Sequence, residues 1–144
     1  MYLEILEQYK KAIEKHYDQA LVASKIKEIG DDAFVWSILS MCIQYEALTA
    51  DIEEDIFKKT PRYNHPWANT REIAKKLNIN IKREYKKAHD AWDLYNSLKH
   101  INDKTQLEKH KIFVKYNIKN IREAAKFVKN SLVNLIYKLG SQTN

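Results

Sequence analysis

The segment AWDLYNSLKHIND, residues 91–103, concentrates the side chains of this chain that could do chemistry. At about 100° of rotation per helical residue, His89, Asp93, Asn96 and His100 fall on one narrow strip. A solvated helix face normally carries Lys and Glu instead, so this strip indicates a contact or a site. Two aromatic residues, Tyr85 and Trp92, border the strip, and the opposite face is expected to enter a core through Ala91, Leu94, Leu98 and Ile101.

Three interpretations of the strip are open. It could pack against another helix or a second subunit, with its polar groups satisfying one another. It could bind a metal ion, because His89 and Asp93 have the i, i+4 spacing that lets two ligands share an ion. The Glu-rich partner motifs of di-metal bundles are missing, however, so no metal is predicted. The third interpretation is phosphate or RNA chemistry centred on Asn96 and His100.

The Asn-x-x-x-His spacing of Asn96 and His100 resembles part of the signature of the HEPN superfamily. That signature is often written Arg-Asn-x-x-x-His, and Tyr95 stands in this chain where the Arg belongs. Trp92 precedes the motif, as in a variant of HEPN-like bacterial proteins. The similarity in sequence covers about ten residues. An all-helical layout with a long helix after the motif agrees with it over most of the chain.

The resemblance implies a homodimer whose paired motifs line a basic cleft, and in many members a metal-independent ribonuclease without a cofactor. His100 would then act as general base on the ribose 2′-hydroxyl or as acid on the leaving oxygen. Asn96 would orient the His or the phosphate. HEPN-like domains also occur as non-catalytic modules in bacterial defence and toxin–antitoxin systems, so a protein partner such as an antitoxin is also possible.

The missing Arg favours binding of RNA or a nucleotide over its cleavage, because the Arg would stabilise the charge of the phosphorane. Lys99 projects to another side of the helix, and Arg83 lies about four turns earlier. Arg62 could reach the site only if its loop folds over it. We predict His100 and Asn96 as catalytic candidates, and as substrate-binding candidates Tyr95, Lys99, Lys104, Trp92, Asp93, His89 and Arg62.

Bulk composition describes a basic globular protein. The chain has 144 residues, a net charge of +6 and a pI near 9.2, which allows a polyanionic partner but also fits a Lys-rich proteome. Cys42 is the only cysteine, so no intramolecular disulfide is possible. Its apolar neighbours in the sequence predict that Cys42 packs as a small hydrophobic side chain. No secretory signal is visible, and the apolar run AFVWSIL is shorter than a membrane span, so a cytoplasmic protein is expected.

Apolar periodicity and the scarcity of Gly and Pro predict one all-α domain over residues 1–144, an up-and-down bundle of four long helices and one short helix. Gly30 should end the first helix, with Asp31 and Asp32 capping the second. Asn69 and Glu72 form a plausible capping box for the short helix. Residues 101–110 are expected to break or bend the chain. The predicted helices span about residues 2–29, 32–59, 70–78, 81–101 and 114–139.

Two further segments have alternative interpretations. TREIAKKLNIN, residues 70–80, resembles the first half of a helix-turn-helix with Asn78 at the turn, which would suit a DNA-binding regulator. Glu84 stands where the second helix needs a small aliphatic residue, so a connecting helix is favoured. In the loop PRYNHPWANT, residues 61–70, Tyr63, His65 and Trp67 could stack bases, or they could plug one end of the bundle. A non-catalytic module for protein–protein interaction is the alternative to RNA binding.

Overall fold

The computed structural model describes residues 1–62 and 65–141, and over these ranges the protein is helical, with no strand. The expected all-α bundle is confirmed. Its elements are α1 (Tyr2–Ala23), α2 (Asp32–Asp51), a π-helical turn η1 (Ile52–Ile56), α3 (Pro66–Lys76), α4 (Lys82–Lys99), α5 (Asp103–Lys115) and α6 (Ile121–Leu139).

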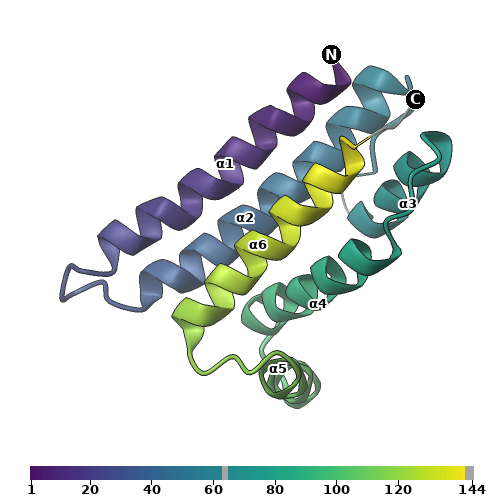
Figure 1. The fold of residues 1–144 in the computed structure, drawn as a ribbon. Coiled ribbons are helices and arrows are strands. Elements are labelled where there is room, and N and C mark those ends of the chain that lie inside the picture. The colour runs from purple at the N-terminus through teal and green to yellow at the C-terminus, as the bar shows by residue number, and fades with distance from the viewer. Residues whose placement is uncertain (63–64, 142–144) are drawn as a thin grey trace.

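Helices α1, α2, α6 and α4 form the body of the bundle (Figure 1). α1 and α2 make an antiparallel hairpin, α6 packs against both of them, and α4 runs antiparallel to α6 while also contacting α2. α3 packs on α2 and η1, and α5 packs on α4. The amino-terminal end of α4 therefore lies beside the carboxy-terminal end of α6.

The three-four spacing of apolar residues in the last helix correctly predicts its buried face. A side chain every three or four residues falls on the same side of a helix, and this side of α6 faces α1, α2 and α4. The buried residues of α6 include Ala125, Val128, Leu132, Leu135 and Leu139. Cys42 is also fully buried, and burial raises the pKa of its thiol, as suits a packed hydrophobic residue.

Helix α2 is apolar on almost every side. From Ala33 to Ala50 its only charged residue is Glu46. Together with η1 it forms a continuous helical stretch, Asp32–Ile56, that is long and apolar enough to cross a membrane by length and composition. In the bundle, 56% of the apolar 18-residue window within this stretch is buried, as in the core helix of a helical bundle.

Several helix ends differ from the prediction. α1 ends at Ala23, and turns connect it to Gly30, which has the expected left-handed conformation with φ +53°. Asp31 is the N-cap of α2, but its side chain makes no capping hydrogen bond. α3 begins at Pro66, which suits the first turn of a helix, so the predicted capping box of Asn69 and Glu72 is wrong.

The segment expected to break the chain, residues 101–110, instead contains most of α5. Asn102 caps this helix by accepting a hydrogen bond from the backbone N–H of Thr105, and the Thr105 hydroxyl accepts one from the Asn102 N–H. Ile112 is the only buried residue of α5, so the apolar periodicity of the sequence gives little indication of this helix. Ile101, predicted to enter the core, is 78% exposed because α4 ends before it.

A buried hydrogen bond between Tyr45 and Thr70 joins α2 to α3, with the two hydroxyl oxygens 2.6 Å apart. The Thr70 hydroxyl donates its one hydrogen to the carbonyl of Pro66, so the Tyr45 hydroxyl donates to Thr70. Removing the tyrosine oxygen therefore deletes one hydrogen bond and leaves Thr70 satisfied.

We predict that Tyr45→Phe lowers the free energy of unfolding by about 1 kcal/mol, the usual net value of one buried hydrogen bond. Thermal and urea denaturation followed by circular dichroism measure this change. Tyr137→Phe is the matched control, because this ring is 73% exposed and should unfold like the unsubstituted chain. Equal stability of Tyr45→Phe and the unsubstituted chain would contradict the assignment.

Candidate nucleic-acid interface

The YNSLKH motif occupies the last turn of α4 and the connection to α5. Tyr95 is only 3% exposed, and Asn96 is partly exposed. The backbone of His100 is fixed on both sides: its N–H donates to the carbonyl of Asn96, and its carbonyl accepts from the Thr105 hydroxyl at 2.5 Å. The His100 side chain is exposed, and no hydrogen bond joins it to Asn96 among the residues that the structure describes.

The remaining members of the predicted strip form one weak pair. His89 Nδ1 lies 3.8 Å from Asp93 Oδ2, and both side chains are partly exposed. Burial raises the pKa of the Asp93 carboxyl, and the nearby His89 opposes this. Within residues 1–62 and 65–141, no three His, Cys, Asp or Glu side chains lie close enough together to hold a metal ion.

Trp67, in the first turn of α3, contacts the predicted strip. Its ring stacks on Tyr45 with centroids 5.5 Å apart, and it contacts Tyr85, His89 and Trp92 at centroid distances of 5.4–5.6 Å. The start of α3 therefore covers the first half of the strip with an aromatic cluster. Trp67 packs as the plug interpretation requires, His65 is exposed, and Tyr63 lies outside the described residues.

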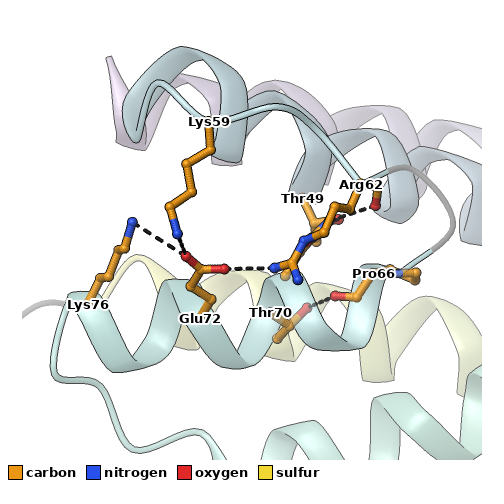
Figure 2. Close-up of polar contacts among 8 residues, drawn as sticks. Thr49, Lys59, Arg62, Pro66, Thr70, Glu72 and Lys76 are labelled. Atoms are coloured by element: carbon orange, nitrogen blue, oxygen red, sulfur yellow. Dashed lines mark hydrogen bonds and ion pairs between the residues drawn. The ribbon is translucent and has the colours of Figure 1, made fainter.

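Arg62 points to α3 rather than to the motif (Figure 2). Its Nη2 lies 2.7 Å from Oε2 of Glu72, whose other oxygen pairs with Lys59 and, at 3.5 Å, with Lys76. The hydrogen bond from Lys59, with the three positive charges, holds the pKa of Glu72 below its ordinary value. Glu72 therefore engages the guanidinium of Arg62, and the role of Arg62 in substrate binding stays a prediction.

Glu53 lies in η1 beside this ion-pair network and is only 1% exposed. Its Oε1 has no hydrogen-bond partner within the described part of the chain. Burial raises the pKa of the Glu53 carboxyl, Glu72 adds to this effect, and Arg62, Lys59 and Lys76 oppose it. A buried carboxylate without a full set of partners costs stability when it ionises.

A basic hollow surface lies elsewhere, between the start of α4 and the end of α6. Two adjoining hollows of about 450 and 330 Å³ share Arg83, Glu84 and Lys138 in their walls. We call this surface the α4–α6 groove. Its lining residues are Asn80, Lys82, Arg83, Glu84, Lys86, Lys87, Ser131, Asn134, Tyr137 and Lys138.

The five cations of the α4–α6 groove have no ion-pair partner within residues 1–62 and 65–141, and Glu84 is the only acid that lines it. Its wall also holds a hydroxyl from Ser131, an amide from Asn134 and the exposed ring of Tyr137. Positive charge, neutral hydrogen-bonding groups and an aromatic face thus lie together. Such a surface can bind phosphates and stack a base.

The groove and the YNSLKH motif occupy opposite ends of α4. His100 follows Arg83 by seventeen positions, which corresponds to about 25 Å along a helix. Lys99, at the motif end, lies over the ring of Tyr95 with its Nζ 3.2 Å from the phenol oxygen. Lys104 is exposed at the start of α5. The structure therefore does not bring the predicted site residues into one cationic hollow.

The sequence contains a signal for the groove that lies outside the YNSLKH motif. KREYKK, residues 82–87, places four cations in six residues at the start of a helix. Only the fold reveals that Lys138 and the polar groups of α6 lie beside them. The helix-turn-helix alternative gains no support, because Glu84 lines the groove beside α6 rather than packing on α3.

No protein-family model, curated protein or solved structure matches this chain. The resemblance to the HEPN superfamily therefore remains a prediction.

We predict that Glu53→Gln stabilises the protein near pH 7 and that this gain disappears toward pH 4. Because the folded-state pKa of Glu53 is raised, its ionisation costs the folded state more than the unfolded state. The unsubstituted chain thus loses stability as the pH rises from the ordinary pKa of a glutamate through the folded-state value. The amide cannot ionise and avoids this loss.

Thermal unfolding at several pH values between about 4 and 8 measures this effect. Glu54→Gln is the matched control, because it makes the same change at the exposed neighbour in η1. A Glu53→Gln variant that is less stable than the unsubstituted chain at neutral pH would show instead that the three cations stabilise the ionised carboxylate.

Proposed function

We propose that this protein binds single-stranded RNA through the α4–α6 groove and does not cleave it. The observation that carries the proposal is the cluster of five cations without ion-pair partners around a hollow that also holds neutral polar and aromatic groups. The net charge of +6 favours the same class of partner.

The position of four of these cations is unfavourable for the free protein. Lys82 and Lys86, like Arg83 and Lys87, are like charges at i, i+4 spacing, which destabilises a helix by a few tenths of a kcal/mol per pair. Lys82 and Arg83 also lie in the first turn of α4, where the helix dipole is positive and disfavours cations, whereas Lys138 lies in the last turn of α6. A bound phosphate would relieve both effects.

Outside the groove, six of the seventeen lysines form ion pairs with acids: Lys10, Lys11, Lys59, Lys76, Lys111 and Lys115. The groove is distinguished by the gathering of five cations around one hollow, and not by the lack of ion pairs alone. This gathering supports a binding surface for an anion.

Single-stranded RNA suits the neutral groups of the groove. The exposed ring of Tyr137 offers a stacking surface for an unpaired base, which a duplex does not present. The exposed Asn134 amide can donate to and accept from a ribose 2′-hydroxyl, the group that distinguishes RNA from DNA, whereas Ser131 is buried in the wall of the groove.

Binding without cleavage follows from the surroundings of His100. Among the described residues its imidazole makes no hydrogen bond with a guanidinium. Arg62 pairs with Glu72, Arg71 donates to Tyr85, Arg122 lies over the ring of Phe34, and Arg83 lies at the other end of α4. A general acid or base without a fixed cation lacks the stabilisation that a phosphorane requires.

We predict that the variant Arg83→Glu/Lys87→Glu/Lys138→Glu binds a fluorescein-labelled single-stranded RNA of about 20 nucleotides roughly 10- to 100-fold more weakly. Fluorescence anisotropy at several salt concentrations measures this. The plot of log K against log salt should become shallower by about 0.7 for each lost phosphate contact. Tyr137→Ala should weaken binding of this RNA and leave binding of duplex DNA unchanged.

The control variant is Lys15→Glu/Lys25→Glu/Lys27→Glu, which carries the same change in net charge at exposed lysines away from the groove. It should bind more tightly than the groove variant. Equal weakening by the two triple variants would show that only net charge matters and would refute the groove. A loss confined to Lys99→Glu/Lys104→Glu would move the site to the YNSLKH motif.

We predict that the purified protein leaves end-labelled RNA intact over hours on a denaturing gel. His100→Ala is the informative comparison. Cleavage that disappears in this variant, while its circular dichroism spectrum stays unchanged, would contradict the proposal and identify a ribonuclease. Cleavage that persists in the variant would come from a contaminating nuclease.

A further inference from the structure

A second hollow adjoins the α4–α6 groove, because the exposed ring of Tyr137 belongs to the walls of both. This hollow has a volume of about 250 Å³ and lies between the first turns of α1 and the end of α6. We call it the Tyr137 hollow. Its lining residues are Leu3, Leu6, Glu7, Lys10, Ile136, Tyr137, Gly140 and Ser141.

The wall of the Tyr137 hollow is largely apolar, and one position in it has no side chain. Leu6 and Ile136 are buried residues of this wall, and Leu3 is 60% exposed. Gly140 has φ −90°, a conformation open to other residues, so the backbone does not require a glycine there. A Cβ atom at Gly140 would lie 3.2 Å from Cδ1 of Leu6 and 3.5 Å from Cδ2 of Leu3. The glycine therefore keeps this part of the hollow open.

The dimensions and surroundings of the Tyr137 hollow suit one flat ring system. Typical small-molecule sites enclose about 300–1,000 Å³. A hollow of about 250 Å³ is therefore too small for a whole nucleotide, but an unpaired base could stack there on Tyr137. The Tyr2 hydroxyl donates to the carbonyl of Leu139 at 2.6 Å and joins the two helices beside the hollow. A strand whose phosphates lie in the α4–α6 groove can thus reach this hollow with a base.

An ion pair on α1 supplies the polar groups of the Tyr137 hollow. Lys10 Nζ lies 3.3 Å from Oε2 of Glu7, and the two side chains are 29% and 50% exposed. Lys11 lies 3.9 Å from the other carboxylate oxygen. Exposed pairs of this kind contribute only about 0–1 kcal/mol, so each group can exchange its partner for a base at little cost. The hollow therefore presents an ammonium donor beside a carboxylate acceptor.

We propose that the Tyr137 hollow binds a guanine base of the RNA strand, with the base stacked on Tyr137 and its Watson–Crick edge turned to Glu7 and Lys10. This inference rests on the proposed binding of single-stranded RNA in the α4–α6 groove and names the base that the strand presents beside it. Guanine carries two adjacent N–H donors, on N1 and N2, and a carbonyl acceptor, O6. The Glu7 carboxylate accepts from both donors, and the Lys10 ammonium donates to O6.

The other three RNA bases match these two groups less well. Adenine and cytosine each present one amino group beside an acceptor nitrogen, so only one oxygen of Glu7 gains a hydrogen bond. Uracil presents one N–H between two carbonyl oxygens, and one of these would face the second carboxylate oxygen. A polar group left without its partner in a binding site is what discriminates between related ligands.

Fluorescence anisotropy with four single-stranded RNAs tests this inference. Each RNA is a uridine strand of about 20 nucleotides with fluorescein at the 3′ end, and three of them carry one central guanosine, inosine or adenosine. We expect the RNA with guanosine to bind roughly tenfold more tightly than the strand of uridine alone. Inosine lacks the N2 amino group and should lose most of this preference.

Glu7→Gln and Gly140→Val should each reduce the preference for guanosine over uridine to about twofold or less. Glutamine offers one acceptor oxygen in place of two, and valine fills the hollow. The ratio of the two Kd values is the readout, because it cancels the general effect of a removed negative charge on RNA binding. Glu4→Gln is the matched control. It makes the same charge change at an exposed glutamate of α1 outside the hollow and should keep the full preference.

The outcomes separate this inference from the proposed function. Equal affinity for the four RNAs, with binding still weakened by Arg83→Glu/Lys87→Glu/Lys138→Glu, overturns the guanine site and leaves the groove in place. A preference for guanosine that survives both Glu7→Gln and Gly140→Val also overturns the site, because the base would then be recognised elsewhere. A chain that binds none of the RNAs refutes the proposed function and the guanine site together. Circular dichroism will verify that each variant is folded, and Glu7→Gln tests the site alone if valine at position 140 disturbs the fold.

Discussion

The covering of α2 is the constraint on which the rest of this structure depends. Between Ala33 and Ala50 this helix has one charged residue, so leaving it in water would expose apolar surface on nearly every side. α1, α6 and α4 pack around it, and α3 closes over its carboxy-terminal half. The buried bond between Tyr45 and Thr70 fixes this last contact. The bundle covers α2 except along the side of the helix that carries the exposed residues Trp36 and Ile43.

The long elements of the fold could be predicted because burial imposes a period on the sequence. α6 faces three other helices, and its apolar residues follow a three-four spacing that predicts the buried face. α5 packs mainly on α4 and buries one residue of its own, so its sequence lacks the apolar periodicity that predicts a helix. Its capping residues, Asn102 and Thr105, are the only local signal, and they lack the glutamate of the common capping box. α3 began earlier than predicted because Pro66 starts a helix rather than ending one.

The candidate site was harder to predict, because it depends on which helices meet. The polar strip of α4 is present in the form that helical geometry requires, and His89 and Asp93 lie close together. Its meaning changed with the tertiary structure: Trp67 covers its first half, and His100 extends into solvent at its end. The sequence cannot show that the start of α4 lies beside the end of α6. A groove built from Arg83 and Lys138, fifty-five positions apart, is therefore a property of the fold.

The α4–α6 groove places cations where the free helix is less stable for them. Among the described residues, Lys82 and Arg83 have no ion-pair partner, and they lie in the first turn of α4, where the helix dipole disfavours positive charge. Lys138 joins them from the last turn of α6. Exchange of Lys82 or Arg83 for an acid would stabilise the isolated helix, so the basic groove has a cost for the free protein. Binding of an anion offsets this cost, and that is the physical argument for an anionic ligand at this place in the fold.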